Sequence, residues 1–171
     1  WVLAAVLLLA GCERVNVGNV GLLINTAGSD RGLQDAPTVS GWVWYNHFTQ
    51  DVIEFSTIMQ TVVWTGAEAI SFGSTEGVNV AADVSVSFRI DPTKAPKFYG
   101  KFRQADLEEF AHGFLRNQVR DALNEAGSTL PVTKIYGDGK TELLHGAHKF
   151  VADRLRDDGV LFLNIGDSFF G

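Results

Sequence analysis

The chain has 171 residues, of which 46% are hydrophobic and 20% are charged, as in an ordinary globular domain. Its 20 acidic and 14 basic residues give a net charge of −6, which disfavours nucleic acid as a partner because phosphate binding needs clustered Lys and Arg. Cys12 is the only cysteine, so an intramolecular disulfide and the usual cysteine-pair metal sites are excluded.

The N-terminal segment WVLAAVLLLAG carries no charge and ends at Cys12. A spanning helix needs about 20 apolar residues and a signal-peptide core needs about 7–15. Residues 9–12 (LAGC) resemble the bacterial lipobox, in which small residues precede a cysteine that is lipidated and becomes the mature N-terminus. We therefore expect residues 1–12 to be a signal peptide with lipid attachment at Cys12. The alternative is a transmembrane anchor that ends near a chance cysteine.

The first half of the chain is rich in strand-forming residues. β-Branched and aromatic side chains predict strands over residues 15–25, 40–48, 52–55, 58–64 and 67–73. Gly, Ser, Asp and Asn between residues 25 and 32 predict a turn. Residues 78–91 alternate strictly between apolar and polar side chains, so we expect one long strand with a single packed face.

The second half is predicted to be helical. Asp91 and Pro92 form a turn signal, after which we expect a short helix that carries Phe98, Tyr99 and Phe102. Apolar residues at three- and four-residue steps predict helices over residues 106–126 and 141–157, and an apolar strand follows at 160–165. Strands followed by helices and one late strand indicate an α+β fold.

The sequence carries no recognisable catalytic motif: G-x-S-x-G, S-x-x-K and a second cysteine are all missing. His145 and His148 have helical spacing, but without Glu or Cys partners they are more simply explained as polar residues on a solvated face. Asp83, Arg89 and Asp91 share one face of the long strand and are explained by solvent or by contact between protomers. We therefore expect no enzyme, no metal and no cofactor.

Three aromatic residues, Trp42, Trp44 and Phe48, allow two interpretations. In a strand, Trp42 and Trp44 point to the same side. Trp is favoured at a lipid–water boundary, where its ring and its N–H are both satisfied, so these residues are candidates for membrane contact. The alternative, which we favour from the sequence, is an aromatic core packed against the helices.

Several segments, in this order, resemble the SPFH domain (band 7, or prohibitin homology). They are NVGLLIN at 19–25, SGWVW at 40–44, FRIDPTKAPKFY at 88–99, FLRNQVRDA at 114–122 and GVLF at 159–162. The likeness extends from about residue 17 to residue 165. It implies a curved, mostly antiparallel sheet with packed helices and a late strand, lying on a membrane. It also implies side-by-side assembly into rings or cages that organise membrane patches or restrain membrane proteases.

The resemblance offers no catalytic residues to transfer, and no heptad segment is visible at the C-terminus. We expect a domain over residues 13–171 that is cut before a coiled coil. The expected function is a membrane-anchored homo-oligomeric scaffold whose partners are membrane lipid, further copies and a membrane protease. The alternative is a monomeric periplasmic lipoprotein that binds a partner. We expect a periplasmic lipoprotein of the bacterial cell envelope, or an inner-membrane protein if residues 1–12 belong to a transmembrane helix.

Overall fold

A computed structural model describes residues 10–27, 32–33 and 40–167. The chain divides into two compact units. Unit 1 contains residues 1–58 and 90–105, and unit 2 contains residues 59–89 and 106–171. The polypeptide therefore passes from one unit to the other at residues 58–59, 89–90 and 105–106, and neither unit is a continuous stretch of sequence.

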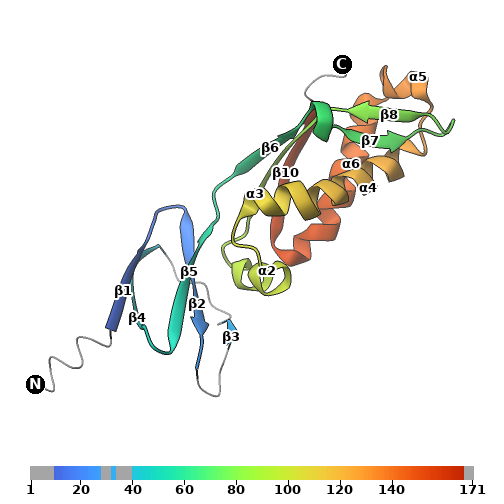
Figure 1. Cartoon of the computed structure of the whole chain (residues 1–171). Helices are drawn as coiled ribbons and strands as arrows, with labels where there is room; N and C mark the ends of the chain where they lie inside the picture. Colours follow the sequence, from blue (N-terminus) through green and yellow to red (C-terminus); the bar gives the residue numbers. More distant parts are fainter. Residues whose placement is uncertain (1–9, 28–31, 34–39, 168–171) are drawn as a thin grey trace, which may run out of the picture. The chain divides into compact units, whose positions relative to one another are not determined.

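Unit 1 is built from short antiparallel strands and one helix (Figure 1). Its elements are β1 (Ala10–Val15), β2 (Asn19–Asn25), β3 (Gly32–Leu33), β4 (Gly41–Asn46), β5 (Gln50–Ser56) and helix α2 (Ala95–Phe102). β1 pairs with β4, and β2 pairs with both β3 and β5. Strand β1 was not predicted, because its sequence follows directly on the apolar N-terminal segment. Part of the turn expected at 25–32 lies outside the described residues.

The β2–β5 pair has a different neighbour on each face. On one face, Val52 forms a buried cluster with Val15 of β1 and Val43 of β4. On the other face, Phe55 lies 5.5 Å from Phe98 of α2 between ring centroids. Side chains of a strand alternate between faces, so Val52 and Phe55, three residues apart, point in opposite directions. Unit 1 is therefore layered, with the β1–β4 pair on one side of the β2–β5 pair and α2 on the other.

Helix α2 is the short helix expected after the Asp91–Pro92 turn, and it extends from Ala95 to Phe102. The Asp91 carboxylate accepts hydrogen bonds from the backbone N–H and the hydroxyl of Thr93, which fixes the turn before the helix. Pro96 lies in the first turn, where its missing N–H costs nothing. Arg103 ends the helix in the left-handed conformation, with φ 56°. Helix α2 places Phe98 in the core of unit 1, so the turn at Asp91 helps to position a core residue.

Unit 2 contains a three-stranded sheet in the order β10-β9-β6 and a separate β7–β8 hairpin. These strands are β6 (Gln60–Trp64), β7 (Ile70–Gly73), β8 (Asn79–Ala82), β9 (Val84–Ile90) and β10 (Val160–Asp167), and the short 3-10 helix η1 (Gly66–Glu68) follows β6. Four residues of β9 with period-two spacing are buried: Val84, Val86, Phe88 and Ile90. The expected packed face of this strand is confirmed.

The single long strand expected over residues 78–91 is divided in two at Asp83. The Asp83 carboxylate accepts a hydrogen bond from the backbone N–H of Gly66, at 3.2 Å. β8 then pairs with β7, whereas β9 pairs with β6 and β10. Val78 precedes β8 and is exposed. The alternation continues across the break, which is why the sequence pattern did not reveal it.

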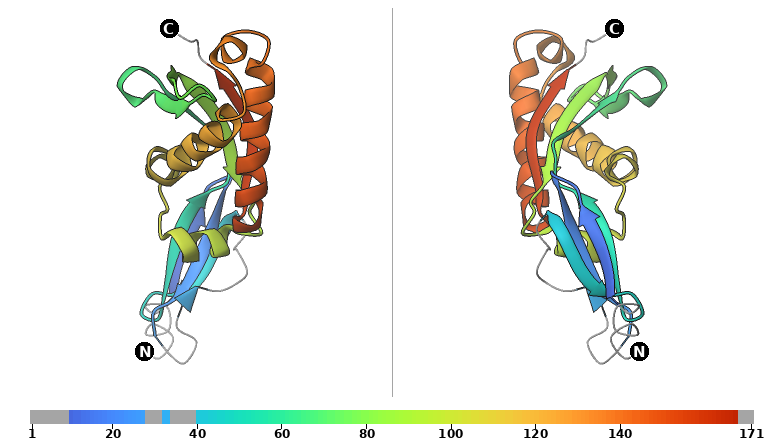
Figure 2. Two further views of the ribbon diagram at one scale, coloured as in Figure 1. Left: turned by 90° about the vertical axis from the view of Figure 1, so that its right-hand side faces the viewer. Right: turned by 90° about the vertical axis from the view of Figure 1, so that its left-hand side faces the viewer.

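The helices of unit 2 are α3 (Leu107–Phe110), the π-helical turn η2 (Ala111–Leu115), α4 (Arg116–Gly127), α5 (Val132–Ile135), α6 (Lys140–Leu155) and the 3-10 turn η3 (Arg156–Asp158). The first three run without interruption through the helix predicted at 106–126. Asp106 caps the start, since its carboxylate accepts a hydrogen bond from the Glu108 N–H at 2.8 Å. α6 packs on α4 and runs alongside β10 (Figure 2).

Large apolar side chains fill the core of unit 2, including the fully buried Trp64, Phe72, Phe88 and Phe110. Gly127, at the end of α4, allows the helix to approach β7 closely. A Cβ atom there would lie 2.7 Å from Phe72 Cδ2 and 2.8 Å from the Gly73 carbonyl oxygen. Antiparallel strands followed by helices and a late strand confirm the α+β fold class.

Candidate membrane-facing surface

Strands β1 and β4 place Cys12 and two tryptophans on one face of unit 1. In the antiparallel register, Cys12 lies opposite Trp44, and Arg14 lies opposite Trp42. Paired residues point to the same face of a sheet, and residues two apart along a strand do so as well. These four residues are all exposed and make up what we call the outer face.

The other side of the β1–β4 pair faces the core. Val43 and Val15 are buried in the valine cluster, and Tyr45 packs partly against it. The Tyr45 ring also covers Gly11, where a Cβ atom would lie 3.0 Å from the ring. Gly11 therefore has a packing role that is independent of any peptidase. Partial burial and the neighbouring Glu13 carboxylate raise the pKa of the Tyr45 hydroxyl.

The preference for an aromatic core at Trp42, Trp44 and Phe48 was wrong. Their exposed fractions are 69%, 72% and 69%. The alternation of side chains in a strand places the two tryptophans on the same side. Because the segment WVWYN is apolar on both faces, the sequence does not show which side is buried. Val43 fills the inner side, and the larger rings are left outside. Two indoles on one face present on the order of 300 Å² of apolar surface, a size at which surface patches are often functional.

Phe48 lies in the turn between β4 and β5 rather than on the outer face. Its backbone N–H donates to the Asn46 side-chain oxygen at 3.0 Å, and the Thr49 N–H donates to the Asn46 carbonyl oxygen at 3.1 Å. The ring of Phe48 contacts His47 edge-on, with centroids 6.3 Å apart. The structure thus holds the Phe48 backbone in an ordered turn and leaves its ring accessible.

Sequence reasoning missed Arg14 as a member of this surface. Arg14 marked only the end of the apolar segment, and its position opposite Trp42 depends on a pairing between distant residues. A cation beside exposed indoles suits the phosphate level of a lipid headgroup layer. If residues 12–14 are recognised as part of a strand, their two-residue spacing places Cys12 and Arg14 on the same face.

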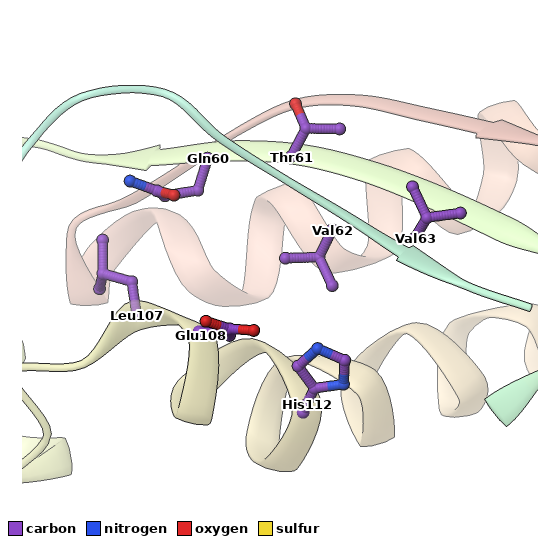
Figure 3. A pocket seen from close by; sticks show the side chains of 7 residues that line it. All are labelled: Gln60, Thr61, Val62, Val63, Leu107, Glu108 and His112. Atoms are coloured by element: carbon purple, nitrogen blue, oxygen red, sulfur yellow. The ribbon is translucent and has the colours of Figure 1, made fainter.

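A second feature is a groove of about 340 Å³ in unit 2, between β6 and the start of the long helix (Figure 3). It is lined by Gln60, Thr61, Val62, Val63, Leu107, Glu108 and His112. Val62 points toward the helix that carries His112, whereas Thr61 and Val63 point to the other side of the strand. His112 lies in the π-helical turn, and its Nδ1 is 3.4 Å from the Glu68 carboxylate.

The structure brings together no catalytic or metal-binding group from the predicted candidates. Among the described residues, no three His, Cys, Asp or Glu side chains are placed to share a metal ion. His148 packs on Phe162 with ring centroids 5.3 Å apart, and His145 is exposed on the same helix. Asp83 accepts a hydrogen bond from the Gly66 N–H and Asp91 accepts one from the Thr93 N–H, so these two carboxylates hold backbone groups in place.

A family model, described as SPFH domain / Band 7 family, matches residues 13–168. The chain belongs to the SPFH domain / Band 7 family. The match covers nearly all of the chain and begins at the residue after Cys12, and it confirms the resemblance carried by the sequence segments. A comparison with curated proteins gives no match.

SPFH proteins are generally membrane-associated scaffolds without enzymatic activity. Within residues 10–27, 32–33 and 40–167, no helix is long and apolar enough to cross a membrane. Within the described part of this SPFH domain, the outer face of β1 and β4 combines a candidate residue for lipid attachment, two exposed tryptophans and a cation.

Proposed function

We propose that this SPFH domain is tethered to a membrane through Cys12, rests on lipid through Trp42 and Trp44, and assembles with further copies into a scaffold. One observation carries the proposal: Cys12 is exposed directly opposite Trp44, on the face that also carries Trp42. Opposite residues of an antiparallel pair have Cβ atoms about 4.5–5.5 Å apart. An acyl chain on Cys12 would therefore enter the bilayer beside an indole ring.

The two tryptophans and Arg14 supply membrane contacts in addition to the lipid anchor. Combined signals hold a protein at a membrane more firmly than one signal alone. Indole rings are stable at the boundary between lipid and water, and the Arg14 guanidinium can donate to lipid phosphate. The outer face would then fix the orientation of unit 1 as well as its attachment.

Signal-peptide cleavage before Cys12 would shorten β1 but leave the outer face intact. It would remove Ala10 and Gly11, which pair with Asn46 and Tyr45. The pairs from Cys12 to Val15 would remain, including both pairs that carry the tryptophans. The proposed lipoprotein therefore keeps its lipid and its tryptophans on adjacent strands.

Attachment to a surface favours assembly. Molecules held in a membrane meet in two dimensions, which raises their effective concentration, and weak lateral contacts between many copies then add up. The proposed scaffold would organise a membrane patch or restrain a membrane protease by position alone. Its partners would be lipid, further copies and the membrane protein that it surrounds.

The membrane proposal is tested with the full chain expressed in a bacterium. Wild type should incorporate labelled palmitate, and Cys12→Ser should abolish that label. Replacing Trp42 and Trp44 together by Ser should lower flotation with liposomes by roughly tenfold or more. The matched control is Tyr136→Ser, which removes an aromatic side chain that is 59% exposed in unit 2.

Each result separates the proposed tether from its alternatives. Membrane attachment without palmitate label would support a transmembrane anchor and contradict lipidation. Equal flotation of the Trp42/Trp44 and Tyr136 variants would contradict lipid contact by the outer face. A sharp monomer of the native protein in mild detergent, in place of a megadalton-scale particle, would contradict the scaffold.

A further inference from the structure

Both edges of the β10-β9-β6 sheet lack the features that normally prevent pairing with another chain. The sequence of β6 is QTVVW and that of β10 is VLFLNIGD, so neither strand contains a proline and their one charged residue is Asp167 at the end of β10. Monomeric proteins protect edge strands with Lys, Pro, bulges or very short strands. The edge strand β5 of unit 1 illustrates such protection, because it carries Asp51 and Glu54.

Each edge also exposes an aliphatic side chain. Val63 of β6 is 45% exposed, and Leu163 of β10 is 46% exposed. Val63 points away from the helix that Val62 faces (Figure 3). Leu163 follows Phe162, which is buried and packs on His148 of α6. Val63 therefore lies on the face of β6 that turns away from the helix beside Val62, whereas Leu163 lines the grooves between β10 and α6.

Grooves along the two edges have complementary charge. The groove beside β6 contains Glu108 and His112, and the 104–115 segment that forms its helical wall contains no Lys or Arg. Of the two grooves beside β10, the one of about 220 Å³ contains Arg156, the one of about 380 Å³ contains His145 and His148, and neither is lined by an acid. The opposite charges are therefore Glu108 and Arg156. Arg156 contacts Asp153 at 3.5 Å, but this ion pair is exposed and therefore weak enough to rearrange.

We propose that β6 of one copy pairs with β10 of the next copy, so that the three-stranded sheet continues from protomer to protomer. This inference rests on the proposed scaffold function and names the surface through which the copies meet. The two edges differ, so the contact is heterologous, and its repetition builds a ring or an open filament. Backbone hydrogen bonds supply the affinity, while Val63, Leu163 and the charged grooves select the partner.

Photo-cross-linking tests this contact in the native full chain, purified in mild detergent. p-Benzoylphenylalanine replaces Val63, and isotopically light and heavy copies are mixed during assembly. We expect cross-linked peptides that join position 63 of one isotope to residues 160–166 of the other. The same photo-reactive residue at Val78, a valine that is 48% exposed but lies outside the sheet edges, should give no such product.

A charge on the edge provides the second measurement. Val63→Lys should lower the assembled fraction by roughly tenfold or more, because every contact would bury a Lys. Val78→Lys should leave the assembly unchanged, and circular dichroism checks that both variants fold.

The two proposals fail in different ways. A native monomer would overturn both the scaffold and this contact. A large native particle that survives Val63→Lys, or that cross-links from position 63 to β6 or to another protein, would overturn the β6–β10 contact alone.

Discussion

The two units use tryptophan in opposite ways. In unit 1, Trp42 and Trp44 lie outside, and the cluster beneath them consists of Val15, Val43 and Val52. In unit 2, Trp64 is fully buried, as are Phe72, Phe88 and Phe110. The same residue type therefore contributes packing energy in one unit and an accessible apolar surface in the other. Aromatic content alone does not distinguish a core from a contact surface; the register of a strand does.

The largest expected effect compares one tryptophan from each unit. Trp64→Ala removes a fully buried ring and should cost about 3–5 kcal/mol of unfolding free energy. Trp44→Ala removes a ring that is 72% exposed and should change stability by less than about 0.5 kcal/mol. Urea unfolding followed by circular dichroism measures both. Similar losses in the two variants would mean that Trp44 is part of a core.

The next comparison uses one helical glycine from each unit. Gly127→Ala should destabilise unit 2 by about 1–3 kcal/mol, because its Cβ would meet the Phe72 ring and the Gly73 carbonyl oxygen. At Gly100, in α2 of unit 1, a Cβ would meet nothing within 4 Å. Gly100→Ala should therefore stabilise the helix by about 0.5–1 kcal/mol. Thermal unfolding checks the signs, and stabilisation by both variants would contradict the tight α4–β7 contact.

The smallest expected effect is a pH dependence at Glu54 of unit 1. The Asn19 side-chain amide and the Asn16 backbone N–H both donate to its carboxylate at 2.8 Å, and these bonds lower its pKa. A lowered folded-state pKa gives stability that is present above the unfolded pKa of about 4.3 and is lost as pH falls through the folded value. The effect is small because Glu54 is exposed.

Comparison of wild type with Glu54→Gln tests this sign. The stability difference between them should be largest at neutral pH and should shrink in acid, as carbon NMR titration of the Glu54 carboxyl would show independently. A difference that does not change between neutral and acidic pH would contradict the role of the ionised carboxylate.

Local sequence patterns predicted the elements whose boundaries have local causes. The α2, α4 and α6 helices, strand β9 and the late strand β10 follow from periodicity and from caps such as Asp106 and Gly159. The break at Asp83 was missed because the alternation continues across it, and the Gly66 N–H that donates to Asp83 there is distant in the sequence. The π-helical turn at Ala111–Leu115 was missed because one widened turn barely alters the apolar spacing.

Three of the four residues of the outer face were predictable from the sequence, but their arrangement was not. Cys12, Trp42 and Trp44 were each recognised from local chemistry. Their meeting on one face depends on the pairing of β1 with β4, and β1 itself was hidden beside the apolar N-terminal segment. The inner position of Val43 likewise depends on Val52 of a third strand. Contacts between distant segments, rather than local propensity, decide both points.

The alternation of the chain between its two units affects the order in which they can form during translation. Most of unit 1 leaves the ribosome first, but helix α2 follows only after residues 59–89, which belong to unit 2. Until α2 is made, Phe55 lacks the ring of Phe98 that covers it. Unit 2 in turn lacks β10 until residues 160–167 are made. Until residue 105 is made, both nascent units therefore expose apolar surface together, and a chain that is terminated before that point would leave neither one finished.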